Sequence, residues 1–453
     1  MPEEETNANG NGNPRRTGDA GAPTLGSGEA SLAPILAVNF VGTMGFSIVL
    51  PFLVFLVTRW GGNALVYGLM GATYSAFQLV GAPILGRWSD LYGRRKILLL
   101  SHLGTLTSWL IFLVAFYLPL TPLARIESPL LGSFTLTLPL LVLFVARAAD
   151  GLTGGNVSVA NAYLADITPE DRRSSNFGKM SVSANLGFVV GPALAGLLGG
   201  TILGERLPVM AALSISLAAA GIIFFRLPES LPCVLSSDPE RPSMRKVFGQ
   251  ELRECFQMAG AEKVPLSKLL RIDRVPLLLA IYFLVMLGFN TFYVAFPLHA
   301  LMGLEWTVRE TGAFFAVLGL LMAIVQGPVL GQASRRWNDG QLILAGSVLL
   351  AASFPCFGAI EAAPVYAGAA LLALGNGLMW PSVISLLSKV AGPRYQGAVQ
   401  GLAGGVGSAA SILGLLGGGL IFDVIGPRTF TLSAIVILLV FVLAWRRLRH
   451  STS

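Results

Sequence analysis

The sequence predicts an all-α membrane protein in which twelve transmembrane helices form two six-helix bundles. Of the 453 residues, 54% are hydrophobic and only 12% are charged, about half the charged fraction of an ordinary soluble domain. Apolar segments of spanning length, about 20 residues each, recur along the chain, and a long polar stretch at 227–276 separates six of them from the other six. So little charge excludes a soluble globular protein, because it cannot cover a surface that faces water.

The twelve expected spans are apolar runs bounded by polar residues, glycines and prolines. They lie at 32–58, 66–85, 97–117, 139–165, 176–200, 207–226, 277–300, 311–331, 341–360, 364–388, 398–422 and 429–446. The first six make a bundle over 32–226 and the last six a bundle over 277–446. The tail at 1–31 is expected to be disordered because it carries no apolar run, and it lacks the apolar core of a signal peptide. A second, short tail follows at 447–453.

Lysine and arginine residues predict the orientation. If both termini are cytoplasmic, 25 of the 31 fall on the cytoplasmic side and five outside, while the remaining one, Arg147, lies inside a span. This asymmetry predicts a multi-pass protein of the inner or plasma membrane with both termini in the cytoplasm. The basic charge then matches anionic membrane lipids rather than nucleic acid. The linker at 227–276 is either partly an amphipathic helix on the inner leaflet or a solvated segment.

The densest cluster of charge is a short loop between the second and third spans. It reads Gly86-Arg87-Trp88-Ser89-Asp90-Leu91-Tyr92-Gly93-Arg94-Arg95-Lys96. Cations at the start of the third span oppose its helix dipole, and Asp90 is the nearest acid that compensates them. Anchoring by positive charge explains the cations but leaves Asp90 and the glycines unexplained. A gating role is the alternative that uses all of them.

Three motifs resemble the major facilitator superfamily, and within it the proton-coupled drug exporters of the tetracycline-type antiporter group. They are the loop just described, the R-x-x-x-G pattern at 147–151 and the G-x-x-x-G-P pattern at 187–192. Weaker resemblance lies in the stretches at 166–173, 227–232 and 397–401. A degenerate copy of the loop at 331–340 occupies the equivalent place in the second half, which indicates an internal repeat.

The resemblance implies two halves related by an axis along the membrane normal, with the substrate site at the midplane between them. It also implies that the loop ties the halves together on the cytoplasmic side when the site faces outward. The expected gating residues are Gly86, Asp90, Gly93, Arg94, Arg95 and Lys96. Exporters of this group often carry an acid in the first span, whereas here Gly42 takes its place.

Arg147 and Asp150 in the fourth span are the candidates for coupling transport to protons. They are three residues apart and therefore neighbours on one helix, and charge inside a membrane must face a cavity or a partner. Two interpretations remain open. Either the pair neutralises itself, or Asp150 binds a proton and releases Arg147, which changes the charge of the cavity by one unit.

Glycines give the spans close contacts. The expected helix-packing motif comprises Gly151, Gly187, Gly191, Pro192 and Gly196. Small residues four apart let helix backbones approach, and a proline inside a helix bends it. This motif favours a tight seam between helices.

Polar and aromatic residues near the span centres are candidates to line the substrate cavity. They are Asn39, Gln78, Asn185, Phe289, Asn290, Tyr293, Gln326, Asn376 and Trp380. Each polar residue equally fits a hydrogen bond between helices, and each aromatic residue equally fits packing. His102, alone in the third span, is expected to be structural.

Together these features predict a secondary active transporter that exports an amphipathic organic small molecule in exchange for protons by alternating access. No phosphate-binding loop is present, so ATP is not the expected energy source, and no cofactor, metal site or enzyme activity is expected. A monomer is expected. The alternatives are a facilitator or symporter of a metabolite, sugar or lipid-like substrate, and a non-transporting membrane sensor on the same fold.

Overall fold

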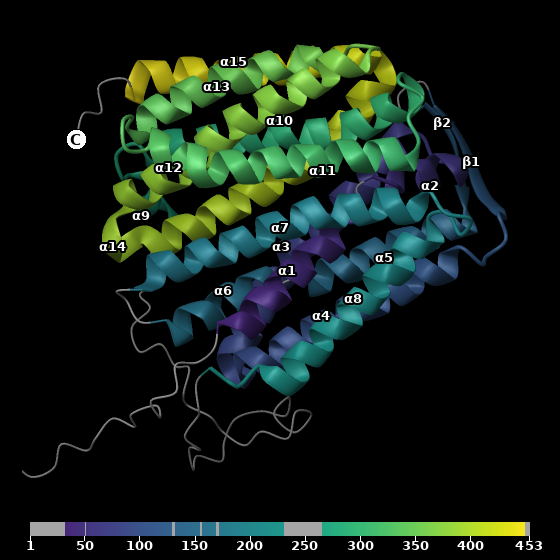
Figure 1. Ribbon diagram of the computed structural model, residues 1–453, viewed down its shortest axis with the longest axis horizontal. Helices are drawn as coiled ribbons and strands as arrows, with labels where there is room; N and C mark the ends of the chain where they lie inside the picture. The colour runs from purple at the N-terminus through teal and green to yellow at the C-terminus, as the bar shows by residue number, and fades with distance from the viewer. Residues whose placement is uncertain are drawn as a thin grey trace, which may run out of the picture.

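The structure is a computed structural model that describes residues 32–49, 51–128, 132–154, 156–168, 172–230 and 265–448. The tail at 1–31 and most of the linker, for which disorder or an amphipathic helix is predicted, lie outside the described residues. Figure 1 shows two bundles of long helices lying side by side, the first in purple to teal and the second in green to yellow. The predicted all-α membrane class is confirmed.

In the part of the chain that the structure describes, the first bundle comprises eight helices and a β-hairpin. Its elements are α1 (Ala33–Ser47), α2 (Leu53–Arg59), α3 (Ala64–Tyr92), α4 (Arg94–Ala115), β1 (Pro122–Ser128), β2 (Gly132–Thr137), α5 (Leu138–Thr153), α6 (Asn156–Ile167), α7 (Arg173–Gly199) and α8 (Arg206–Arg226). The second bundle follows the short helix α9 (Leu266–Leu270). Its elements are α10 (Val275–Met302), α11 (Val308–Ile324), η3 (Val325–Val329), α12 (Leu330–Ala333), α13 (Asp339–Cys356), α14 (Ala362–Ile425), η4 (Gly426–Arg428) and α15 (Thr429–Leu448).

Nine helical stretches in the described part of the chain are long and apolar enough to cross a membrane. One of them, Ala398–Arg446, holds two of the expected spans, which part at the turn around Gly426. The first two expected spans correspond to α1 with α2 and to α3. Gly392, with φ 65° and ψ 170°, separates the tenth from the eleventh expected span within α14. The element order is therefore consistent with twelve spans.

Two expected spans are interrupted. The first breaks between α1 and α2 next to Pro51, because proline cannot donate the helical hydrogen bond and its ring crowds the preceding turn. The fourth breaks after Gly154 into α5 and α6. Both breaks were missed because the apolar runs continue through them.

The β-hairpin lies between the third and fourth spans, where the sequence indicated a loop. β1 and β2 pair antiparallel, and Gly132 takes φ 70°, a left-handed conformation that favours glycine. Backbone and side-chain bonds anchor the hairpin to the turn before α3: Thr135 N donates to Gly61 O over 2.8 Å and Thr137 Oγ1 to Trp60 O over 2.7 Å. Figure 1 shows the hairpin at the opposite end of the molecule from α9.

The two bundles interlock at the hairpin end. A Cβ on Gly68 of α3 would lie 2.4 Å from Leu415 O of α14, and one on Gly312 of α11 would lie 2.6 Å from the Cα of Gly196 on α7. Neither position has room for a side chain, so glycine is what lets the backbones of the two halves touch. At the other end of α3, a Cβ on Gly86 would meet nothing within 4 Å.

Aromatic side chains fill the core of the second bundle. Phe292, Phe296 and Phe314 are fully buried, and the rings of Phe296 and Phe314 stack with centroids 4.1 Å apart. Aromatic pairs add about 0.5–1.5 kcal/mol beyond the area they bury. This cluster reaches Tyr293, whose ring centroid lies 6.0 Å from that of Phe292.

Candidate functional site

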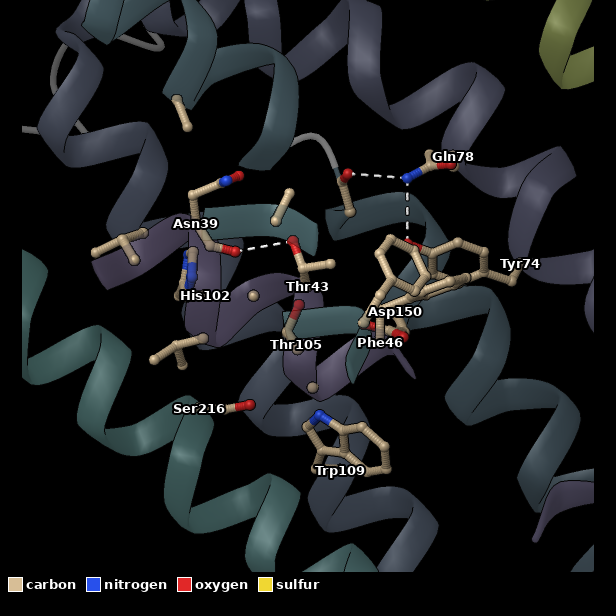
Figure 2. Close-up of a pocket in the computed structure, with 18 residues that line it drawn as sticks. Asn39, Thr43, Phe46, Tyr74, Gln78, His102, Thr105, Trp109, Asp150 and Ser216 are labelled. Atoms are coloured by element: carbon tan, nitrogen blue, oxygen red, sulfur yellow. Dashed lines mark hydrogen bonds between the residues drawn. The ribbon is translucent and has the colours of Figure 1, made fainter. Parts of the chain in front are cut away.

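The first bundle encloses a cavity of about 320 Å³, here called the N-half pocket. Helices α1, α3, α4, α5, α6, α7 and α8 contribute residues to it, and Figure 2 shows their side chains. Its polar lining residues are Asn39, Thr43, Tyr74, Gln78, His102, Thr105, Trp109, Asp150 and Ser216. Gly42, where the resemblance led us to look for an acid, lines it too.

Asp150 and Arg147 form a buried ion pair at this pocket. Arg147 Nη1 lies 3.1 Å from Asp150 Oδ2, and the two side chains are 7% and 13% exposed. The Arg147 guanidinium lies 4.5 Å from the ring centroid of Tyr74, and Thr105 lines the same cavity as Asp150. Burying two charges is tolerated when each has such partners. Asp150 therefore lines the cavity while it is paired with Arg147, which is not among the lining residues.

Asn39 and Gln78 both line a cavity and form hydrogen bonds between helices, the two roles that the sequence left open. Asn39 Nδ2 donates to Met180 O over 2.9 Å and to Ser183 Oγ over 2.8 Å, which ties α1 to α7. Gln78 Nε2 donates to Tyr74 Oη over 3.1 Å and to Gly154 O over 3.2 Å, the bonds drawn in Figure 2. Both side chains line the N-half pocket while they hold helices together.

Sequence reasoning missed three lining residues on one face of α4. His102, Thr105 and Trp109 are three and four residues apart, a spacing that places them on the same helix face, and all three line the N-half pocket. The same span also holds Ser101, Thr107 and Ser108, so its polar residues alone did not single out this face in the sequence. His102 was instead expected to be a structural residue.

A second cavity of about 200 Å³ lies between the two bundles and is here called the interface pocket. Its walls come from α7, α10, α11 with η3, and α14. Six of the predicted cavity residues line it: Asn185, Phe289, Tyr293, Gln326, Asn376 and Trp380. Asn185 Nδ2 donates to Gln326 Oε1 over 3.0 Å, so this hydrogen bond crosses from one half to the other.

Asn290 differs from the other predicted cavity residues. Its Nδ2 donates to Met286 O over 2.8 Å and to Ser411 Oγ over 3.0 Å, which joins α10 to α14. It lines neither of the two pockets. The position is one residue from Phe289, and that step of about 100° around the helix turns its side chain toward α14.

The two pockets share one wall residue, Phe188 of α7. Its ring meets Phe46 of α1 edge to face, with centroids 6.1 Å apart. A polar cavity inside the first bundle thus adjoins an aromatic cavity between the bundles. This pairing suits a molecule with one polar and one apolar part.

The charged loop makes its described contacts to the ends of α6 and α8. Arg94 Nε lies 3.0 Å from Asp166 Oδ2, and the Arg95 side chain donates to the carbonyls of Ile223 and Phe224. The backbone N–H of Arg95 donates to Glu229 Oε1 over 3.3 Å. Asp166 begins the weakly matching stretch at 166–173, and Glu229 lies within the one at 227–232. Both are acids that compensate the cations at the start of α4.

Glycine is favoured at position 93 both by the backbone conformation and by the closeness of the Glu229 side chain. Its φ is 101°, and a Cβ there would lie 2.5 Å from Glu229 Oε2. The side chain of Asp90 lies outside the described residues, so its predicted contact is not placed. Lys96 opens α4 beside Arg95.

The packing glycines serve three different seams. A Cβ on Gly187 or Gly191 would strike α1, at 2.8 Å from Phe40 O and 2.1 Å from Ser47 Oγ. A Cβ on Gly151 of α5 would lie 2.3 Å from Tyr74 O of α3. Gly196 lies in the seam between the halves, and Pro192 lines the interface pocket.

Two bundles of apolar helices, with one cavity inside the first bundle and one between the bundles, are typical of a membrane transporter. The family described as Major Facilitator Superfamily matches residues 35–414 and 341–453. The chain belongs to the major facilitator superfamily, as its motifs predicted.

Its relatives include named resistance proteins. The chain is 28% identical to the class D tetracycline resistance protein of Salmonella ordonez over 370 residues, which are 81% of this chain and 83% of that protein. It is 23% identical to multidrug resistance protein 2 of Bacillus subtilis (strain 168) over 429 residues, with 92% and 96% covered. The solved structure of the human organic anion transporter MFSD10 (TETRAN) matches with TM-score 0.63 at 21% identity, covering 91% of this chain and 98% of that chain. That structural likeness shows the fold alone.

Proposed function

We propose that this protein exports an amphipathic organic compound in exchange for protons. The observation that carries the proposal is Asp150, an acid that lines a cavity while paired with Arg147 at 3.1 Å. When Asp150 binds a proton, its carboxyl group becomes neutral. The positive charge of Arg147 is then no longer compensated, and the charge near the cavity changes by one unit. Proton binding is then linked to the affinity for a cargo molecule, as any two sites that share an interaction are.

The cargo's apolar part fits the interface pocket. Phe289, Tyr293 and Trp380 supply aromatic surface there, and Asn185 and Gln326 supply polar groups from opposite halves. A site built from both halves changes shape when the halves move, which alternating access requires. Tetracycline is the first compound to test, because several relatives are named for resistance to it.

The ends of the two bundles act as gates in this proposal. The glycine contacts at Gly68 and Gly312 close the hairpin end, which the charge asymmetry assigns to the outside. The loop at 86–96, with Gly86, Asp90, Gly93, Arg94, Arg95 and Lys96, latches the cytoplasmic end in the opposite state. The protein works as a monomer in the inner or plasma membrane, with both termini cytoplasmic.

Gradient-driven flux tests the proposal. Purified protein in liposomes, oriented as in everted membranes, is given a pH gradient that is acid inside, and uptake of radiolabelled tetracycline is followed. Uptake above the equilibrium level that collapses with a protonophore supports antiport. Flux that only equilibrates tetracycline and ignores the gradient contradicts it and points to a facilitator.

A further inference from the structure

Asn376 of α14 presents a buried carboxamide to the interface pocket. The residue is 5% exposed and lines the pocket, and no hydrogen bond to its side chain occurs within the described part of the chain. Buried polar groups in proteins usually have hydrogen-bond partners, so an occupant of the pocket is the natural partner. The amide carries an N–H donor and a C=O acceptor on one side chain, and their spacing is therefore fixed by covalent geometry.

Close packing on both sides holds Asn376 in place. A Cβ on Gly375 would lie 2.4 Å from Leu350 N of α13, and one on Gly377 would lie 2.6 Å from Val325 Cγ1. The two glycines next to Asn376 thus let α14 approach α13 on one side and η3 on the other. A carboxamide on such a rigid support has little freedom to find another partner.

The neighbouring η3 turn brings a second carboxamide to the pocket. η3 is a π-helix, a local distortion of a helix that is frequent at functional sites. Gln326 lies in this turn, and its Oε1 accepts the hydrogen bond from Asn185 of the first half. The polar part of the interface pocket therefore consists of amide groups from both halves.

The lining of the interface pocket carries no full charge. No aspartate, glutamate, lysine, arginine or histidine is among its thirteen described lining residues. An ion buried there would lose its water without gaining an opposite charge, which is costly. The N-half pocket differs, because Asp150 lines it. The interface pocket therefore favours an uncharged group.

Aromatic side chains give this pocket flat walls. Trp380 lies one helical turn after Asn376, so both side chains share a face of α14. Tyr282 of α10 packs against the indole of Trp380, with centroids 4.7 Å apart. Phe289 and Tyr293 meet edge to face with centroids 4.8 Å apart. A planar ring packs well against such walls.

We propose that the interface pocket binds an uncharged planar ring that has an amide edge, as in a lactam or a cyclic imide. The ring N–H donates to Asn376 Oδ1 and the ring C=O accepts from Asn376 Nδ2, so the two amides pair through two hydrogen bonds. A ligand reaches the pocket when the two halves part. That this ring belongs to the exported cargo rests on the proposed function, whereas its binding does not.

Equilibrium dialysis with purified full-length protein in detergent tests the assignment. Three radiolabelled probes of similar shape are compared. Carbostyril is a bicyclic lactam, N-methylcarbostyril lacks its N–H donor, and N-methylquinolinium is a cation. The wild-type protein should bind carbostyril about three- to tenfold more tightly than N-methylcarbostyril, the effect of one hydrogen bond. The cation should bind more weakly than carbostyril.

Substitution of Asn376 identifies the partner. Asn376→Leu should weaken the binding of carbostyril about tenfold or more, because both hydrogen bonds are lost. Carbostyril and N-methylcarbostyril should bind this variant equally, since the ligand N–H no longer has an acceptor. Asn290, which lines neither pocket, provides the matched control Asn290→Leu. The control should keep the wild-type affinity for carbostyril in protein that remains folded, as judged by its melting temperature.

The outcomes separate this assignment from the proposed function. A wild-type protein that does not bind carbostyril, or that binds the two lactams equally, overturns the amide pairing, and so does wild-type affinity in Asn376→Leu. Tighter binding of the cation than of carbostyril overturns the uncharged class. If carbostyril binds through Asn376 but a pH gradient drives no uptake of it or of tetracycline, the site stands and proton-coupled export fails. If the gradient drives tetracycline uptake and carbostyril does not bind, export stands and this assignment fails.

Discussion

The N-half pocket and the interface pocket differ in what lines them and in what holds them together. The first lies within one bundle, and its lining includes the acid of an ion pair, a histidine and several hydroxyls. The second lies between the bundles, and its walls are mainly aromatic and aliphatic. A site within a rigid bundle keeps its charges at fixed distances, whereas a site between bundles changes as they move. In the proposed mechanism, the first pocket couples transport to protons and the second adapts to the cargo.

Removal of Arg147 should have the largest effect on stability. Arg147→Ala leaves Asp150 buried without its partner, which costs about 3–5 kcal/mol. Denaturation of the purified protein in detergent measures the loss, and Arg147→Ala with Asp150→Ala should recover most of it.

An exposed ion pair provides the contrast. Lys389 Nζ lies 2.7 Å from Asp339 Oδ2 with the Lys389 side chain 67% exposed, so Lys389→Ala should cost less than about 1 kcal/mol. Equal losses for Arg147→Ala and Lys389→Ala would show that burial does not distinguish the N-half pocket.

Closure at the hairpin end should be the next most sensitive feature. A valine at Gly68 would collide with Leu415 O, which lies 2.4 Å from the position of an added Cβ. We expect Gly68→Val to reduce tetracycline transport about tenfold or more, because the two halves can no longer meet there. Transport by Gly417→Val is the comparison, since a Cβ at Gly417 meets nothing within 4 Å. Normal transport by Gly68→Val would mean that this contact is not part of the cycle.

Loss of an aromatic wall should affect cargo binding alone. Trp380 lines the interface pocket and lies 4.7 Å from Tyr282, centroid to centroid. Trp380→Ala should raise the KM for tetracycline about tenfold while the dependence of uptake on the pH gradient persists. Trp445, 44% exposed on α15, provides the control substitution Trp445→Ala. A changed proton dependence with an unchanged KM would reverse the roles of the two pockets.

The hydrogen bond between the halves should have the smallest effect. Asn185→Leu removes the partner of Gln326, and such bonds within membranes contribute about 0.6 kcal/mol on average. We expect a two- to threefold change in transport rate, and no further change when Gln326→Leu is added. Additive losses in the double variant would indicate that each residue contacts something else during the cycle.

Much of the fold was predictable from the sequence because apolar length is a strong signal in a membrane. The breaks near Pro51 and Gly154 and the hairpin from Pro122 to Thr137 were not predicted, since hydropathy reports length and ignores local backbone geometry. Arg147 and Asp150 were paired correctly in space because three residues on one helix fix their proximity.

The rest of the site depends on contacts between distant helices. Asn39 and Gln78 line the N-half pocket. Asn376 and Trp380 line the interface pocket. The sequence could not separate these two groups, because the separation depends on how the bundles pack. The sequence likewise could not show that His102 Nε2 is buried without a hydrogen-bond partner among the described residues, because this depends on what surrounds α4.

Proton release per cargo molecule is the most direct test of the division between the pockets. Tetracycline-driven proton flux is followed with a pH-sensitive dye trapped in proteoliposomes, in wild type, Asp150→Asn and Trp380→Ala. We expect Asp150→Asn to abolish proton movement while tetracycline still exchanges by counterflow, and Trp380→Ala to keep the wild-type ratio of protons to tetracycline at a lower rate. Proton movement that persists in Asp150→Asn at the wild-type ratio would contradict the account.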